Sequence, residues 1–190
     1  MALDLRSLWS KATPYHEFVR EAVANRELWK AMEQIARVPE WAIAAVRGSD
    51  EKFNLLVLAE DWCGDGSSTI PYLAKLATLT RSIEVRVLRR DEHPAVMDRY
   101  LTDGARAIPI VIVLNRQLEE LGHWGPRPRD LQEWVRNERA KTGMKPPYPQ
   151  IRRWYARDKG ESALREVVEL FAKKPSAVSS QPSAVLAMTG

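Results

Sequence analysis

The residue best placed for chemistry is Cys63, the only cysteine among 190 residues. It follows a short apolar run, 53–59, that is typical of a strand buried on both faces. It precedes a stretch from Ser67 to Leu79 with helical spacing of apolar residues. A thiol at such a junction lies near helix N-terminal amides, which favour thiolate over thiol. The chemistry that this position predicts is nucleophilic attack by sulfur.

A single cysteine also excludes several classes of site. It cannot form an intramolecular disulfide, and alone it cannot build a cysteine-based zinc site. The three histidines, His16, His93 and His123, are far apart in sequence and show no ligand spacing. We therefore expect neither a metal nor a cofactor.

The elements around Cys63 follow from hydrophobic periodicity. We expect helices within 14–47, then strands at 53–59, 83–88, 108–114 and 118–124. Further helices are expected at 67–79, 94–101, 129–142 and 151–174, the last with an interruption near Gly160. The strand–helix–strand start favours parallel pairing, and the turn near Asn115 favours an antiparallel edge. The sequence thus predicts an α/β fold with a mixed sheet and helices on both faces.

Four features of residues 50–140 together resemble the thioredoxin-like superfamily. The strand running into Trp62-Cys63-Gly64 is similar to the family's active-site turn, and Pro71 stands where the family has a helix-kinking proline. The segment 104–109 resembles the stretch that ends in isoleucine and a cis-proline, and an apolar strand, a turn, a short strand and Gly122 follow it. The motif Trp-Cys-Gly-Asp without a second cysteine is similar to that of other bacterial thioredoxin-like proteins.

The resemblance implies a thioredoxin-like mixed sheet flanked by helices, with helical extensions at both ends. It implies that Cys63 is the nucleophile and that a cis Pro109 packs beside it. The backbone of Ile108 would pair with a bound chain, in the manner of strand addition. The substrate-binding residues that it implies are Trp62, Gly64, Asp65, Ile108 and Pro109.

The sequence departs from the family at the redox pair. Gly66 stands where the second cysteine belongs, so two-cysteine exchange within the chain is excluded. Val57 replaces the family's buried acid. Three acidic residues near the thiol, Glu60, Asp61 and Asp65, oppose the helix dipole, and the sign of the net pKa shift stays open. Asp65 is alternatively a helix cap.

Several functions remain open at the level of sequence. The first is a monothiol thiol–disulfide oxidoreductase, in which Cys63 forms a mixed disulfide with a protein or small-molecule thiol and an external thiol resolves it. The second is a non-catalytic binding module that keeps the groove. Others are a redox sensor that condenses with another chain, and a cysteine with no chemistry at all.

Composition adds expectations about organisation and partners. We expect an N-terminal helical extension (1–50), a thioredoxin-like core (51–142), a helical appendage (143–174) and a flexible tail (175–190). Residues 1–125 carry a net charge of −2 and residues 126–190 carry +6, so a basic face that meets an acidic partner is a further hypothesis.

The same composition bears on location. Arg152 to Arg157 mixes basic and aromatic residues, which fits an amphipathic helix as well as an RNA contact, and no nucleic-acid-binding motif accompanies it. No apolar run is long enough for a membrane span, and no secretory signal opens the sequence. We expect a cytoplasmic protein without a membrane partner, and the oligomeric state is left open.

Overall fold

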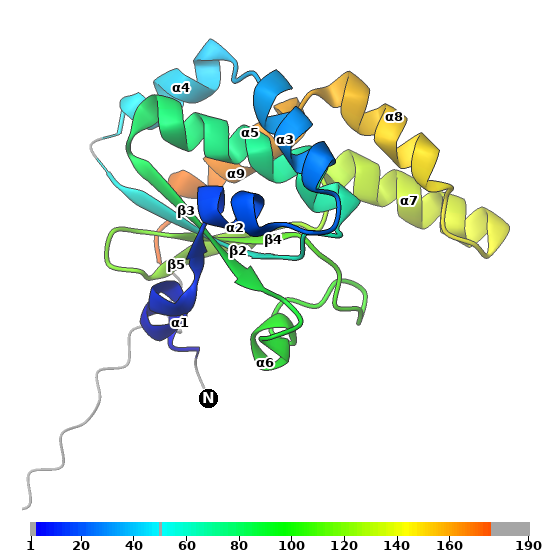
Figure 1. Cartoon of the computed structure of the whole chain (residues 1–190), viewed down its shortest axis with the longest axis horizontal. Helices are drawn as coiled ribbons and strands as arrows, with labels where there is room; N and C mark the ends of the chain where they lie inside the picture. The colour runs from blue at the N-terminus through cyan, green and yellow to red at the C-terminus, as the bar shows by residue number, and fades with distance from the viewer. Residues whose placement is uncertain (1–2, 50, 176–190) are drawn as a thin grey trace, which may run out of the picture.

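The computed structural model describes residues 3–49 and 51–175 (Figure 1). Helices and strands alternate along the chain after an N-terminal group of helices. The helices are α1 (Leu5–Lys11), α2 (Tyr15–Glu21), α3 (Arg26–Ile35), α4 (Glu40–Arg47), α5 (Gly64–Thr80), α6 (Pro94–Met97), α7 (Arg129–Thr142), α8 (Tyr148–Asp158) and α9 (Glu161–Phe171). The strands are β1 (Thr13–Pro14), β2 (Phe53–Ala59), β3 (Ile83–Arg89), β4 (Ile110–Leu114) and β5 (Glu120–Trp124).

Within the described residues the five strands form one mixed sheet, in the order β1-β3-β2-β4-β5. The central pair β2 and β3 is parallel, whereas β4 pairs antiparallel with both β2 and β5. The predicted α/β fold with parallel and antiparallel pairing is therefore confirmed. The parallel pair needs a long crossover, which α5 supplies, and the antiparallel pair β4–β5 needs only a turn.

Both faces of the sheet are covered, which explains why β2 is apolar throughout. Leu55 and Val57 pack into a core with α2, α3, α4, α5 and α9. Leu56 and Leu58 point to the opposite face, where α1 and α6 lie. Successive side chains of a strand alternate between faces, so a strand covered on both sides reads as a continuous apolar run.

The N-terminal region differs from the expectation of helices from residue 14 onward. Thr13 and Pro14 form the edge strand β1, which pairs antiparallel with β3 opposite Val87 and Arg86. A proline suits an edge, because it has no N–H to offer a further strand. Helix α1 was not predicted either. The first fifty residues thus supply part of the sheet as well as helices.

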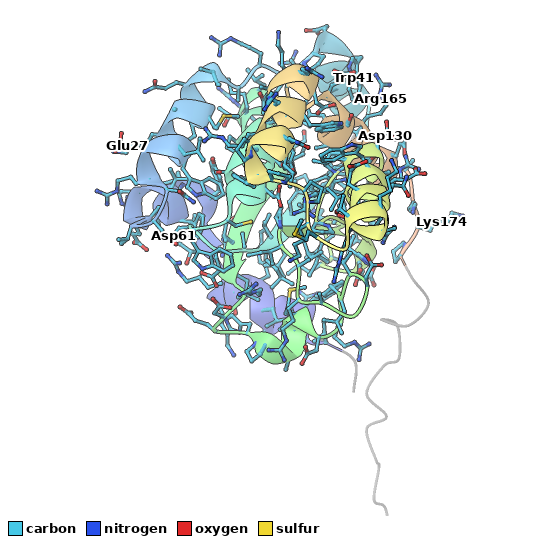
Figure 2. All side chains as sticks on the ribbon, turned by 90° about the vertical axis from the view of Figure 1, so that its right-hand side faces the viewer. Glu27, Trp41, Asp61, Asp130, Arg165 and Lys174 are labelled. Atoms are coloured by element: carbon cyan, nitrogen blue, oxygen red, sulfur yellow. The ribbon has the colours of Figure 1, made fainter. Side chains whose placement is uncertain are left out.

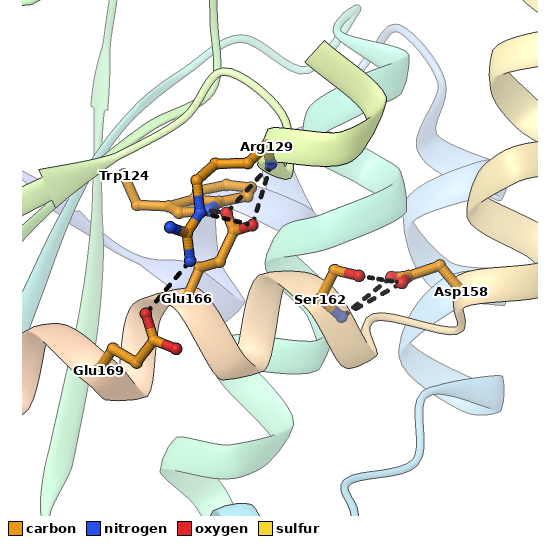
Figure 3. Close-up of polar contacts among 6 residues, drawn as sticks. All are labelled: Trp124, Arg129, Asp158, Ser162, Glu166 and Glu169. Carbon is orange, nitrogen blue, oxygen red and sulfur yellow. Dashed lines mark hydrogen bonds and ion pairs between the residues drawn. The ribbon is translucent and has the colours of Figure 1, made fainter. Parts of the chain in front are cut away.

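At the C-terminal end, the expected interruption of 151–174 separates α8 from α9. Gly160 has φ 78°, and a Cβ there would lie 2.3 Å from the ring of Tyr72, so only glycine fits this corner. The Asp158 carboxylate closes the corner by accepting hydrogen bonds from the Ser162 N–H and hydroxyl (Figure 3).

Helix α9 is fastened to the sheet through one carboxylate. Glu166 accepts from the indole N–H of Trp124 at 2.6 Å and from the backbone N–H of Arg129 at 3.0 Å (Figure 3). One side chain of α9 thereby joins the end of β5 to the start of α7. Of the predicted tail, residues 176–190 lie outside the described residues. No helix in the described parts of the chain has the length and apolar character that a membrane span requires.

Candidate functional site

Cys63 lies at the N-terminus of α5, where it is the N-cap residue. Its Sγ accepts a hydrogen bond from the Gly66 N–H at 3.4 Å. The same sulfur donates to the carbonyl oxygen of Ile108 at 3.4 Å. The thiol is 6% exposed and packs among apolar residues of the α1–α6 face. The strand-to-helix junction predicted for Cys63 is thus where the structure places it.

Ile108 and Pro109 lie directly beside the thiol, and the peptide bond between them is cis. Both residues are buried. Gly125 packs against this segment so closely that a Cβ there would lie 2.1 Å from the Pro109 carbonyl oxygen. The φ of Gly125 is 124°, which also favours glycine. The loop after β5 thereby supports the backbone that faces Cys63.

The thiol is held in its protonated form. Burial raises the pKa of Cys63 to about 11, the charge of Asp65 adds to the rise, and the Gly66 N–H and the Arg127 guanidinium oppose it. The helix terminus and the nearby carboxylates act on this pKa in opposite directions, so the motif alone does not fix the sign of the shift. Desolvation, the largest contribution, decides it.

Two of the three acidic residues near the turn are engaged elsewhere. The Glu60 carboxylate accepts from the Asp91 N–H at 2.8 Å and pairs with Arg89 at 3.4 Å. The Asp61 carboxylate accepts from the N–H groups of Val23 and Ala24, at 2.8 and 3.2 Å, and so fixes the segment between α2 and α3. These carboxylates serve the packing of neighbouring segments.

Asp65 forms a buried ion pair with Arg127, which lies on the loop after β5. The closest approach is 2.6 Å, between Asp65 Oδ2 and Arg127 Nη2. Burial raises the pKa of Asp65, although the guanidinium opposes this rise. The alternative expectation, that Asp65 caps α5, is wrong, since the cap is Cys63 and the carboxylate faces Arg127.

Trp62 forms an exposed edge beside the buried thiol. Its side chain is 46% exposed, and the Arg90 guanidinium lies 4.9 Å from its ring centroid. Arg90 also donates to the Arg106 carbonyl oxygen at 3.1 Å, so it joins Trp62 to the segment leading into Ile108. The Trp62 carbonyl accepts from the Asn25 amide at 2.7 Å.

Helix α8 covers the turn from the other side. A Cβ on Gly64 would lie 1.6 Å from the hydroxyl oxygen of Tyr148, so the tyrosine occupies the space that a larger residue would need. Burial raises the pKa of Tyr148 to about 12, with contributions from Asp65 and Cys63. The thiol is therefore enclosed, with Trp62 and Tyr148 half-exposed on either side.

A thioredoxin family model matches residues 12–141, more than half of the chain. The chain belongs to the thioredoxin family. Two solved structures share the fold: a protein of unknown function from Pseudomonas aeruginosa (21% identity, TM-score 0.72, covering 90% of this chain and 98% of that one), and an HIV epitope-scaffold (19% identity, TM-score 0.70, covering 87% and 96%). None of the curated proteins matches the chain.

Within this family fold, three residues at the site escaped prediction from the sequence. Arg90, Arg127 and Tyr148 all reach the turn from segments distant in sequence. Arg90 and Arg127 stand in loops without periodicity, and Tyr148 lies within a proline-rich stretch. Only the Gly125-Pro126 dipeptide before Arg127 indicates a turn at this position.

Across residues 3–49 and 51–175, no three His, Cys, Asp or Glu residues come together as ligands would. The chemistry available at the turn is that of one thiol, one buried ion pair and two aromatic edges.

Proposed function

We propose that this thioredoxin-family chain is a non-catalytic binding module, in which the thioredoxin site contacts a partner without thiol–disulfide exchange. The observation that carries the proposal is the state of Cys63, which is buried, hydrogen-bonded on two sides and raised in pKa to about 11.

The state of the thiol bears directly on its reactivity. With this pKa, on the order of 0.03% of the thiol is ionised at pH 7.4, against roughly 2% for a cysteine with the ordinary pKa of about 9. The thiolate is the attacking species, so the rate of exchange falls with its population. Gly66 in place of a second cysteine removes the internal resolving step as well.

The surface that supports partner binding is the exposed edge of the turn. Trp62 offers an accessible aromatic ring, and Arg90 stacks on it as a neighbouring cation. Tryptophan and arginine are the residue types that most often dominate binding energy at protein interfaces. The carbonyl of Ile108, by contrast, accepts from the Cys63 thiol, so it is already engaged.

Thiol reactivity in the folded protein tests the proposal. Native protein is incubated with oxidised glutathione at pH 7.4 and followed by intact mass, with unfolded protein as the positive control. We expect the adduct in the unfolded sample and none in the native sample over the same time. Rapid glutathionylation of the native protein would overturn the proposal.

Partner capture then separates docking from chemistry. Cys63→Ser should retain the partners that the native chain retains, whereas Trp62→Ala should lose them. Trp154→Ala on α8, away from the turn, is the matched control. Loss of capture in Cys63→Ser alone would indicate that the thiol is required.

A second candidate, a monothiol oxidoreductase, is favoured by one contact. The Gly66 N–H points at Sγ from the first turn of α5, an arrangement that stabilises a thiolate. If partner binding moved Tyr148 and opened the turn, this donor would support attack on a disulfide. Mixed disulfides trapped on native Cys63, absent in Cys63→Ser, would support this function over the first.

A further inference from the structure

A large hollow lies between helices next to the Cys63 turn, and Tyr148, whose hydroxyl lies against Gly64, is one of its lining residues. It has a volume of about 1130 Å³ and is bounded by α3, α5 and α8, together with the 37–39 segment. Helices α3 and α8 both pack on α5 (Figures 1 and 2). The space between them is the cavity, and it is as large as cavities that hold organic ligands.

One wall of the cavity is apolar. Leu28, Met32, Ile35 and Val38 come from α3 and the segment after it, and Tyr72 and Tyr155 come from α5 and α8. Ile35 is 59% exposed, which is unusual for a large aliphatic side chain. An apolar wall of this kind suits a hydrocarbon chain.

The other wall is cationic. Arg152, Arg153 and Lys159 line it from α8 and its end, and their side chains form no hydrogen bond or ion pair with other residues that the structure describes. Arg37 also lines the cavity, but it donates to the carbonyls of Gln34 and Ala36. The first three cations can therefore receive an anion.

The two carboxylates at the cavity form no ion pair with these three cations. Asp158 is held by the Ser162 N–H and hydroxyl (Figure 3). Glu161 accepts from the indole N–H of Trp41 at 3.0 Å and pairs with Arg165 at 2.6 Å. Trp41 and Arg165 lie together on this side of the molecule (Figure 2).

We propose that this cavity binds an amphipathic organic anion of the fatty-acid type, with its hydrocarbon chain along α3 and its carboxylate at Arg152 and Arg153. Apolar burial would supply most of the affinity, and the arginines would select the charge of the head group. The proposal does not use the Cys63 thiol or the Trp62 edge, although Tyr148 borders both the cavity and the turn.

Fluorescence titration tests it. The probe is 11-(dansylamino)undecanoic acid, whose emission rises in an apolar site, with palmitate as the competitor. We expect saturable binding, displacement by palmitate, and no displacement by hexadecanol at the same concentration. Lack of probe binding to the folded protein, or equal displacement by the uncharged alcohol, would overturn the proposal.

Variants locate the site. Removing both cations in Arg152→Gln/Arg153→Gln should lower the affinity for the probe about tenfold or more. Ile35→Glu places a carboxylate on the apolar wall and should abolish binding. The matched controls are Arg157→Gln, on the same helix outside the cavity, and Val23→Glu, an exposed apolar position outside it.

Thermal melting confirms that each variant is folded. Equal loss of affinity in the test and control variants, or none in either, would place the probe elsewhere and refute the proposal. Unchanged binding in Cys63→Ser is expected, so failure of the proposed function at the turn leaves this result unaffected.

Discussion

The Arg127 guanidinium lies 2.6 Å from the Asp65 carboxylate, in a pair that is largely buried behind the Cys63 turn. Asp65 follows Gly64 in α5, whereas Arg127 stands on the loop that also holds Gly125 against Pro109. One ion pair thus joins the start of α5 to the loop that supports the segment facing the thiol. A buried pair of this kind is sensitive to the loss of either partner, because the other is left without compensation.

Arg127→Met should therefore destabilise the protein by about 3–5 kcal/mol, measured by urea unfolding at pH 7. Loss of the guanidinium raises the pKa of Asp65 further in the folded state. A raised folded-state pKa gives stability that is present below the unfolded pKa and lost as pH rises, so the deficit should shrink as pH falls toward about 4.

Arg136→Met is the control for this prediction. Arg136 pairs with Asp103 at 2.8 Å, but both side chains are more than half exposed. An exposed pair contributes little to stability, so we expect a much smaller loss than in Arg127→Met. A deficit in Arg127→Met that stays constant with pH would contradict the account of Asp65.

Gly125→Ala should disturb the segment that carries Ile108 and Pro109. The added Cβ would meet the Pro109 carbonyl oxygen at 2.1 Å, and backbone atoms cannot yield as a flexible side chain can. We expect a loss of at least about 3 kcal/mol in unfolding free energy, from this clash and from the positive φ together.

Gly104→Ala separates the two causes. Gly104 has φ 74°, but no atom lies within 4 Å of the place that an added Cβ would take, so only the conformational cost remains. That cost is about 1 kcal/mol. Similar losses in the two variants would show that the contact with Pro109 is unimportant.

Gly64→Ala should expose the thiol by moving Tyr148. The Cβ would lie 1.6 Å from the tyrosine hydroxyl, and the ring is half-exposed and able to turn away. Alkylation of Cys63 by iodoacetamide at pH 8 should accelerate about tenfold, as for a fall of one pKa unit. Tyr148→Ala should give a similar gain, and the two changes combined should not add. Unchanged alkylation in both would indicate that Tyr148 does not shield the thiol.

The elements that hydrophobic periodicity and local residue order determine could be predicted from the sequence. The apolar run of β2, the alternation in β3 and the glycine between α8 and α9 all have local physical causes, so the sheet and the place of Cys63 followed from them. The two-residue strand β1 has no periodicity to detect, and its pairing with β3 depends on tertiary contact.

The environment of the thiol could not be predicted in the same way. Its pKa depends mainly on burial, and the thiol is buried among side chains such as Ile108 that are distant in sequence. The motif placed acidic residues near sulfur, yet only Asp65 acts on the thiol, because Glu60 and Asp61 are turned toward other partners. Side-chain direction decides such cases, and one sequence does not reveal it.

The free energy of unfolding should fall at alkaline pH because of the Cys63 thiol. The folded-state pKa is raised from about 9 to about 11, so the unfolded chain loses this proton first as pH rises. Stability from this group is thus complete below about pH 9 and is lost as pH rises toward 11, by about 3 kcal/mol in all.

Several tyrosines, Tyr148 among them, titrate with the same sign, so a single unfolding curve cannot isolate the cysteine. The difference between the native chain and Cys63→Ala isolates the cysteine together with its electrostatic coupling to Tyr148, because the other tyrosines contribute equally to both proteins. Urea unfolding at pH 7.5, 9, 10 and 10.5 should show the advantage of the native chain shrinking above pH 9. A difference that stays constant over this range would mean that Cys63 has an ordinary pKa. It would favour the monothiol function over the proposed binding module.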